Sequence, residues 1–191
     1  MMKRNECLRA LHELRGRDVV VVTTMGSALP WSRLSQSPLD FPSAGSAMGH
    51  AADFAMGIAL AQPQRQVWAL NGDGSMLMCL GTLVTICQTP PANLVLFVFQ
   101  NDTFEVTGNQ PIPGAGKISM VELAEGAGFE RAYEFDTTEK ISRQLPSILT
   151  QAGPTFVNLR IEAGREPPPV PAQPLRDVIA DLRQALRVSA P

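Results

Sequence analysis

Four short apolar runs, separated by helical patterns, constrain the fold of this chain most strongly. The runs lie within the segments DVVVVTT, QVWAL, NLVLFVFQ and PTFVNLRIE. The first and third are continuously apolar rather than alternating, which is typical of strands that are covered on both faces, as in parallel sheets. Because strands and helices alternate along the chain, we predict an α/β fold: a single three-layer domain with a mainly parallel sheet and helices on both faces.

The remaining segments set the expected boundaries. Residues 1–165 are predicted to form the main domain, and residues 166–191 a proline-rich linker (EPPPVPAQP) followed by a C-terminal helix that packs on the same domain. We expect one helix over residues 75–88 and a loop at MGSALPW. Residues 101–117 lack periodicity and contain several turn residues, which predicts a long loop or lid.

Composition excludes several classes of partner. The net charge is −2 and Lys and Arg do not cluster, which argues against nucleic acid or an anionic membrane as a partner. No apolar run approaches the roughly 18 residues of a membrane span. The first twenty residues are charged throughout and lack the apolar core of a secretory signal. Three cysteines without CxxC spacing (Cys7, Cys79 and Cys87) indicate reduced thiols, and we expect a cytoplasmic protein.

An acidic residue flanked by two glycines follows the second predicted strand, in NGDGSMLM. A dinucleotide fingerprint does not fit, since its third glycine would fall on Leu77. A P-loop does not fit either, because GAGK is followed by Ile118, where Ser or Thr is required. A site for a divalent metal and a diphosphate agrees better with the sequence. Gly72 and Gly74 allow close approach of the backbone, and Ser75 opens a helix whose free N–H groups favour phosphate.

Asp73 would then be an oxygen ligand of Mg²⁺, which prefers carboxylate and phosphate oxygens together. A second oxygen could come from Asn101, which follows the next strand. Residues 75–100 hold one helix and one strand, and this length returns the chain to the same edge of the sheet. Ligands of open α/β sheets bind at the carboxyl ends of the strands.

The order of strand, Gly-Asp-Gly, helix, strand and Asn resembles the cofactor-binding motif of thiamine diphosphate-dependent enzymes. The resemblance covers about residues 18–162 and implies the thiamine diphosphate-binding fold, with thiamine diphosphate and Mg²⁺ as cofactors. It implies that the side chains of Asp73 and Asn101 and the carbonyl of Thr103 bind Mg²⁺. Simple capping of a helix and of a turn is the alternative role for Asp73 and Asn101.

Two further stretches resemble the same family. SAMGHA resembles the segment that holds the aminopyrimidine ring, which implies that Met48 bends the cofactor and that the carbonyl of Ser46 accepts from its amino group. The family usually has Gly at this second position, whereas here Gly45 lies one residue earlier. Core packing is the alternative role of Met48. TTMGSALPW resembles the first diphosphate loop, which implies contacts from Thr24, Gly26, Ser27 and Ala28.

MGHA, TGNQ and the proline-rich run are similar to segments of phosphonopyruvate and sulfopyruvate decarboxylases. This implies a diphosphate- and Mg²⁺-binding subunit of a two-subunit, thiamine diphosphate-dependent 2-oxo acid decarboxylase. A complementary subunit would bind the pyrimidine and supply the activating glutamate, in a hetero-oligomer such as one with two of each chain. The alternatives are a subunit of another thiamine-dependent carboligase or oxidoreductase, and a non-catalytic scaffold or regulatory subunit that retains the fold.

Two residues are candidates for proton transfer. His50 follows the pyrimidine segment and could contact the substrate; the alternative is a histidine at a helix start that the backbone satisfies. Glu105 lies just after the predicted metal ligands and could face either the cavity or the solvent. The amides of TGNQ at 107–110 could bind a substrate carboxylate or sulfonate, or this segment could act as a lid.

Overall fold

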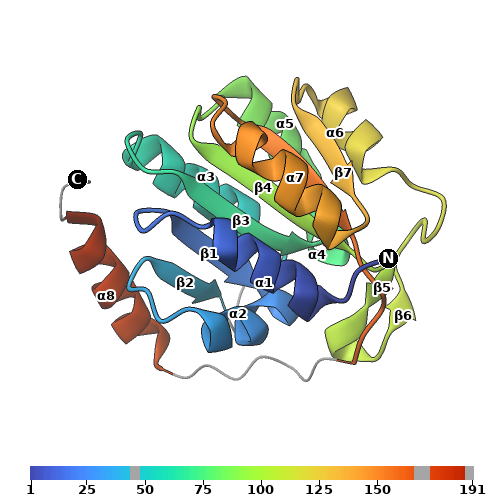
Figure 1. Ribbon diagram of the computed structural model, residues 1–191, viewed down its shortest axis with the longest axis horizontal. Helices are drawn as coiled ribbons and strands as arrows, with labels where there is room; N and C mark the ends of the chain where they lie inside the picture. Colours follow the sequence, from blue (N-terminus) through green and yellow to red (C-terminus); the bar gives the residue numbers. More distant parts are fainter. Residues whose placement is uncertain (44–47, 166–172, 188–191) are drawn as a thin grey trace.

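Six parallel strands form the central sheet of the computed structural model, which describes residues 1–43, 48–165 and 173–187 (Figure 1). The strand order is β2-β1-β3-β4-β8-β7, and every neighbouring pair is parallel. The predicted α/β fold is therefore confirmed. The strands are β1 (Val20–Thr24), β2 (Asp40–Ser43), β3 (Val67–Gly72), β4 (Leu94–Gln100), β7 (Ala132–Phe135) and β8 (Thr155–Arg160).

Helices cover both faces of this sheet (Figure 1). One face is packed by α1 (Arg4–Leu14), α2 (Ala28–Leu34) and α7 (Thr138–Leu149). The other face is packed by α3 (Ala51–Ala61), α4 (Asp73–Met78), α5 (Gly81–Gln88), α6 (Met120–Ala127) and α8 (Leu175–Arg187). The described residues thus form three layers, with one apolar core on each side of the sheet.

The two cores explain why the strands are apolar at consecutive positions. Every residue of β1 and β4 is buried. Successive side chains of a strand point to opposite faces, and so Val21 packs in the core beneath α1 and α7, whereas Val22 packs in the core beneath α3. Folding removes both side chains from contact with water, and the burial of each one stabilises the fold by about 1.5–3 kcal/mol.

The two ends of the described chain are tied to this frame. Met2 forms a parallel bridge with Ile161, just after β8, and its N–H donates to the carbonyl of Arg160 at 3.3 Å. Near the other end, Leu182 of α8 is buried against the same core as α3. Most of the proline-rich linker, residues 166–172, lies outside the described residues. Within the described ranges, none of the helices combines the length and apolar character needed to cross a membrane.

Four local features differ from the sequence-based expectations. MGSALPW forms a 3-10 turn, η1 (Met25–Ser27), and the start of α2 rather than a loop, while β2 was not predicted. β2 is a short edge strand that contains Pro42, so it lacks the apolar run of a central strand. Residues 75–88 form two helices, because the chain leaves helical geometry at Cys79 before α5. Residues 101–117 contain β5 (Thr103–Phe104), η2 (Glu105–Thr107) and β6 (Gln110–Pro111).

Candidate functional site

The candidate site lies at the carboxyl ends of β1, β3 and β4. The connection after β1 leads to β2 on one side of the sheet, whereas the connection after β3 leads to β4 in the opposite direction. The strand order therefore reverses between β1 and β3. Crevices at such reversals are the usual ligand sites of open α/β sheets. The segments that follow these three strands begin at Met25, Asp73 and Asn101, and all three contribute to one pocket.

Asp73, the first residue of α4, is at the centre of a hydrogen-bond cluster. Its Oδ1 accepts from the N–H of Gly74 at 2.7 Å, and its Oδ2 accepts from the N–H groups of Asn101 at 3.0 Å and Asp102 at 2.7 Å. A carboxylate has about four acceptor positions. The three backbone donors therefore hold the side chain in place and leave room for a further ligand.

The charge of Asp73 is not fully compensated by these bonds. The residue is only 2 % exposed. This burial raises the pKa of Asp73 to about 6, although the three backbone N–H groups act in the opposite direction. A buried carboxylate with a raised pKa is typical of a functional site and is expected to be stabilised by a cation.

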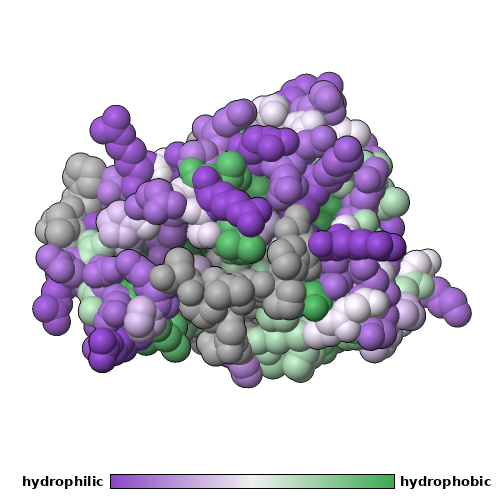
Figure 2. Space-filling model, turned by 90° about the horizontal axis from the view of Figure 1, so that it is seen from below, coloured by the Kyte–Doolittle hydropathy of each residue, from purple (hydrophilic) through white to green (hydrophobic). Residues whose placement is uncertain are grey.

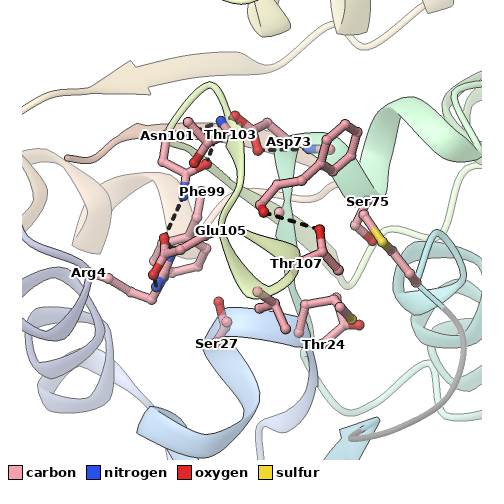
Figure 3. Close-up of a pocket in the computed structure, with 17 residues that line it drawn as sticks. Arg4, Thr24, Ser27, Asp73, Ser75, Phe99, Asn101, Thr103, Glu105 and Thr107 are labelled. Atoms are coloured by element: carbon pink, nitrogen blue, oxygen red, sulfur yellow. Dashed lines mark hydrogen bonds and ion pairs between the residues drawn. The ribbon is translucent and has the colours of Figure 1, made fainter. Parts of the chain in front are cut away.

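Asn101 presents its side-chain amide at the end of β4 (Figure 3). The amide Oδ1 accepts from the N–H of Thr103 at 3.1 Å, and Nδ2 donates to Oε2 of Glu105 at 2.7 Å. Between them, Asp102 adopts a left-handed conformation with φ of 59°, which turns the chain back toward the site. Asn101 and Asp73 are thus fixed relative to each other by backbone hydrogen bonds.

The pocket gathers most of the residues that the sequence singled out (Figure 3). The predicted site residues that line it are Thr24, Gly26, Ser27, Met48, Gly72, Asp73, Gly74, Ser75, Asn101, Thr103 and Glu105. Ser46, together with Gly45, lies outside the described residues. His50 is absent from the described lining.

Two glycines have different surroundings. A Cβ at Gly74 would lie 2.5 Å from Cε1 of Phe104, so this position accepts only glycine without rearrangement of that ring. At Gly72 no heavy atom lies within 4 Å of the corresponding position. Gly72 lines the pocket, and the open space above it is where a ligand can approach the backbone.

The segment after β1 forms the opposite wall of the pocket. Thr24 is buried, and its Oγ1 has no hydrogen-bond partner among the residues that the structure describes. A buried hydroxyl without a partner costs free energy, so a polar ligand in the pocket would satisfy it. Ser27 is also buried and faces the pocket. A Cβ at Gly26 would lie 3.1 Å from the guanidinium of Arg4, which shows how closely α1 approaches this loop.

Ser75 and His50 are engaged on the α3 side of the site. The hydroxyl of Ser75 accepts from the N–H of Gly49 at 2.8 Å and so ties the start of α4 to the segment before α3. His50 is the N-cap residue of α3, and its side chain is 56 % exposed. Its Nδ1 lies 2.8 Å from Oδ2 of Asp53, and its Nε2 lies 4.0 Å from Sγ of Cys79. The role of His50 stays a prediction.

Glu105 faces the pocket and is only 7 % exposed. Both of its carboxylate oxygens pair with the guanidinium of Arg4: Nη1 donates to Oε1 at 2.7 Å, and Nη2 donates to Oε2. Glu105 therefore interacts with Arg4 and Asn101, which limits its use as a proton donor or acceptor.

Sequence reasoning did not identify six lining residues: Arg4, Met25, Phe99, Phe104, Val106 and Thr107. One signal was present for Arg4. It lies at helical spacing from Leu8 and Leu11 on the buried stripe of α1, and an arginine on a buried stripe requires a counterion. Phe99 belongs to the buried strand β4, and the other four residues belong to short turns and a small hairpin without periodicity.

The donors of the site fit a metal that is shared with a phosphate ligand. No group of three or more His, Cys, Asp or Glu side chains within the described ranges could hold a metal ion by itself. The pocket instead offers the buried carboxylate of Asp73, the amide oxygen of Asn101 and the main chain of Thr103, while the carboxylate of Glu105 is paired with Arg4. Mg²⁺ is usually held in this way, by one or two protein carboxylates together with phosphate oxygens and water.

Comparison with known proteins agrees with this geometry. The family described as "Thiamine pyrophosphate enzyme, C-terminal TPP binding domain" matches residues 23–159. A phosphonopyruvate decarboxylase from Streptomyces viridochromogenes is 36 % identical over 157 residues, which are 82 % of this chain and 38 % of that protein. The beta subunit of sulfopyruvate decarboxylase from Methanothermobacter thermautotrophicus is 32 % identical over 168 residues, with 86 % of each chain covered.

A solved structure with the same fold is that of benzoylformate decarboxylase from Polynucleobacter necessarius. Its TM-score is 0.69 at 20 % identity, and the match covers 86 % of this chain and 34 % of that one. The chain thus spans 38 % of the length of the phosphonopyruvate decarboxylase that it matches, but 86 % of the sulfopyruvate decarboxylase beta subunit.

Proposed function

The chain belongs to the family of C-terminal TPP-binding domains of thiamine pyrophosphate enzymes, and from this premise we propose that it is the diphosphate- and Mg²⁺-binding subunit of a 2-oxo acid decarboxylase. The observation that carries the proposal is the convergence of Asp73 and Asn101, which follow different strands and are joined by a 3.0 Å hydrogen bond in the wall of one pocket. This pair supports a metal and diphosphate site at the position that the family requires.

The residues of the chain have distinct roles in this proposal. Asp73, the side chain of Asn101 and the carbonyl of Thr103 would hold Mg²⁺. The segment that contains Thr24, Gly26 and Ser27, together with Gly72, Gly74 and Ser75, would contact the diphosphate; the unpartnered hydroxyl of Thr24 supports this assignment.

Bound thiamine diphosphate supplies the thiazolium carbon that adds to the carbonyl of a 2-oxo acid and takes up the electron pair left by loss of CO₂. The protein contributes position and electrostatics. The backbone N–H groups that fix Asp73 would hold the metal ligand ready, and Met48, which lines the pocket, would press on the cofactor and orient it. Such fixed geometry lowers the cost of bringing the reacting groups together.

We propose that a complementary subunit completes the active site, binds the pyrimidine and provides its activating glutamate. Two observations support this part of the proposal. A relative that the chain covers over most of its length is a beta subunit. In addition, large apolar side chains are exposed on α3, α4 and α5, namely Phe54, Leu60, Met78 and Val84, and exposed apolar residues of neighbouring helices are common at protein interfaces. By contrast, the face shown in Figure 2 is mostly hydrophilic, with small apolar areas.

The substrate class follows from the two decarboxylase relatives. We propose a small 2-oxo acid that carries a second anionic group, sulfonate or phosphonate. Among the residues that line the described pocket, Arg4 is the only cationic one, and it is paired with Glu105. The group that recognises the second anion would therefore come from the complementary subunit or from the described chain outside this pocket.

The test is to purify the tagged chain from its native cells with any companion, and to measure CO₂ release from sulfopyruvate and phosphonopyruvate. We expect a companion of similar size and a release that requires both thiamine diphosphate and Mg²⁺. Asp73→Ala should abolish it. Asp136→Ala is the matched control, because Asp136 is a carboxylate that pairs with Lys140 at the surface.

Persistent activity of the Asp73→Ala complex would refute the metal assignment. A chain that is purified without a companion, and that releases no CO₂, would refute the two-subunit decarboxylase. The scaffold or regulatory role would then be the better account.

A further inference from the structure

A buried chain of charged and polar groups connects α1 to the proposed metal ligand Asn101. Arg4 pairs with Glu105 through both nitrogens of its guanidinium, and Glu105 accepts from Nδ2 of Asn101 at 2.7 Å (Figure 3). Arg4 and Glu105 are 9 % and 7 % exposed. Charges that are this deeply buried persist only when they are paired and hydrogen-bonded.

We propose that Glu105 is a positioning residue for the metal site, with Arg4 as its counterion, rather than a group that transfers protons to substrate. The inference rests on the proposed function, because it takes Asn101 as a ligand of Mg²⁺. An amide can present either its oxygen or its nitrogen, and only the oxygen binds a metal ion. Because Glu105 accepts from Nδ2, the oxygen Oδ1 is held on the other side of the amide, where it can serve the metal.

The N-terminal segment is built to deliver Arg4 to this place. The bridge between Met2 and Ile161 fixes the chain immediately before α1, and the N–H of Glu162 donates to the carbonyl of Met2 at 2.8 Å. Arg4 is the first residue of α1, so its side chain starts from a fixed point and reaches the pocket.

The segment after β8 also lies close to the carboxylate of Glu105. A Cβ at Gly164 would lie 2.8 Å from Oε1 of Glu105, and the carbonyl of Gly164 accepts from Nδ2 of Asn109 at 2.9 Å. Arg4 and Gly164, which lie beside Glu105, thus come from segments before and after residues 23–159, which match the family. Of these two residues, Arg4 also lines the pocket.

Outer partners that orient metal ligands commonly contribute 10- to 100-fold in metal affinity. The test compares two double variants of the full chain. In R4M/E105M the ion pair is replaced by apolar side chains, which buried sites usually tolerate, and the acceptor for Asn101 is lost. In R4M/E105Q the charges are also removed, but the amide oxygen of the new side chain can still accept from Asn101.

The first readout is Mn²⁺ affinity at saturating thiamine diphosphate, measured by electron paramagnetic resonance. We expect a loss of about 10- to 100-fold for R4M/E105M and of about fivefold or less for R4M/E105Q, since a neutral acceptor replaces a charged one. The control is R15M/D40N, which removes a partly buried ion pair, with a 2.8 Å contact, away from the pocket. It should bind Mn²⁺ as the unmodified chain does.

The second readout is independent of any cofactor. The side-chain NH₂ resonances of Asn101, assigned by their loss in Asn101→Asp, should lie downfield and exchange slowly with water. R4M/E105M should abolish both properties, whereas R4M/E105Q should keep the slow exchange. If the unmodified chain, assembled with its companion, binds no Mn²⁺ with thiamine diphosphate, the proposed function fails, and the NH₂ resonances still decide whether Glu105 positions Asn101.

Three results would overturn the inference: unchanged NH₂ resonances in R4M/E105M, Mn²⁺ affinity of R4M/E105M equal to that of the unmodified chain, or losses in R4M/E105Q or R15M/D40N as large as in R4M/E105M. Far-ultraviolet circular dichroism and thermal unfolding of each variant identify any loss of folding. If R4M/E105M alone fails to fold, R4M/E105Q is compared with the unmodified chain instead. The downfield position of the Asn101 NH₂ resonances should then be lost while their slow exchange remains, and an unchanged position would overturn the inference.

Discussion

The carboxylate of Asp73 accepts a hydrogen bond from the backbone N–H of Asn101 at 3.0 Å, although the two residues are 28 positions apart. One follows β3 and the other follows β4, and the parallel pairing of Gly72 with Phe99 brings these strand ends together. The proposed metal ligands are therefore placed by the sheet itself. A cofactor would meet a site whose two side chains already have fixed positions.

The buried carboxylate of Asp73 should titrate near pH 6, because burial raises its pKa to about 6. Since this pKa lies above that of the unfolded chain, the group favours the folded, metal-free state most below about pH 4, and this contribution is lost as the pH rises through 6. A metal ion requires the ionised form, so Mg²⁺ with thiamine diphosphate should lower the pKa. The measurement is the carboxyl ¹³C resonance of Asp73, assigned with Asp73→Asn. A midpoint near 4 in the metal-free chain would contradict the role of burial.

Replacing Gly74 with alanine should destabilise the fold by about 1–3 kcal/mol, because the new Cβ would lie within 2.7 Å of two ring atoms of Phe104. Gly126→Ala is the matched control. Gly126 is an exposed residue of α6, and a Cβ there meets no atom within 4 Å, so this change should stabilise the chain by about 0.5–1 kcal/mol. Urea unfolding at constant pH measures both. Equal effects would show that Phe104 does not pack on Gly74.

The segment 101–117 should become resistant to trypsin when thiamine diphosphate and Mg²⁺ are added. Lys117 is exposed at its end, and the segment contains left-handed turns at Asp102 and Asn109. A metal bound by Asn101 and Thr103 would fix its start. The measurement is the rate of cleavage after Lys117, with thiamine diphosphate and chelator as the control. An unchanged rate at saturating cofactor would refute the idea that the segment closes as a lid.

His50→Gln should lower the turnover of the assembled enzyme about 100-fold or more if His50 transfers a proton, while the affinity for thiamine diphosphate and Mg²⁺ stays the same. The second expectation follows from the position of His50, which is half exposed and does not line the described pocket. Turnover and cofactor affinity together distinguish proton transfer from a structural role of His50. A loss of affinity with normal turnover would indicate a structural role at the start of α3.

The fold could be predicted from the sequence because its strands are apolar on both faces. β1 and β4 are buried at every position, and runs of this kind have few alternative structures. β2 could not be predicted, since an edge strand with Pro42 carries little apolar signal. The break between α4 and α5 also escaped prediction, because the apolar pattern continues through Cys79 and Leu80.

The candidate site could likewise be predicted only in part from the sequence. Asp73 and Asn101 carry a local signal, glycine neighbours in one case and the end of an apolar run in the other. The position of Arg4 on the buried stripe of α1 indicates that it needs a counterion but not which residue supplies it, because that depends on the bridge between Met2 and Ile161, which brings distant parts of the chain together. The pairing of Arg4 with Glu105 is a tertiary contact between residues 101 positions apart, and no periodicity of the sequence encodes it.

The central claim is that Asp73 and Asn101 bind Mg²⁺ together with thiamine diphosphate. Isothermal titration of the full chain with thiamine diphosphate at pH 7.5, once with Mg²⁺ and once with chelator, tests it most directly. We expect saturable binding that requires Mg²⁺ and that Asp73→Ala abolishes, while Asp136→Ala leaves it unchanged. Binding of equal strength with chelator, or in Asp73→Ala, would show that Asp73 does not hold the metal.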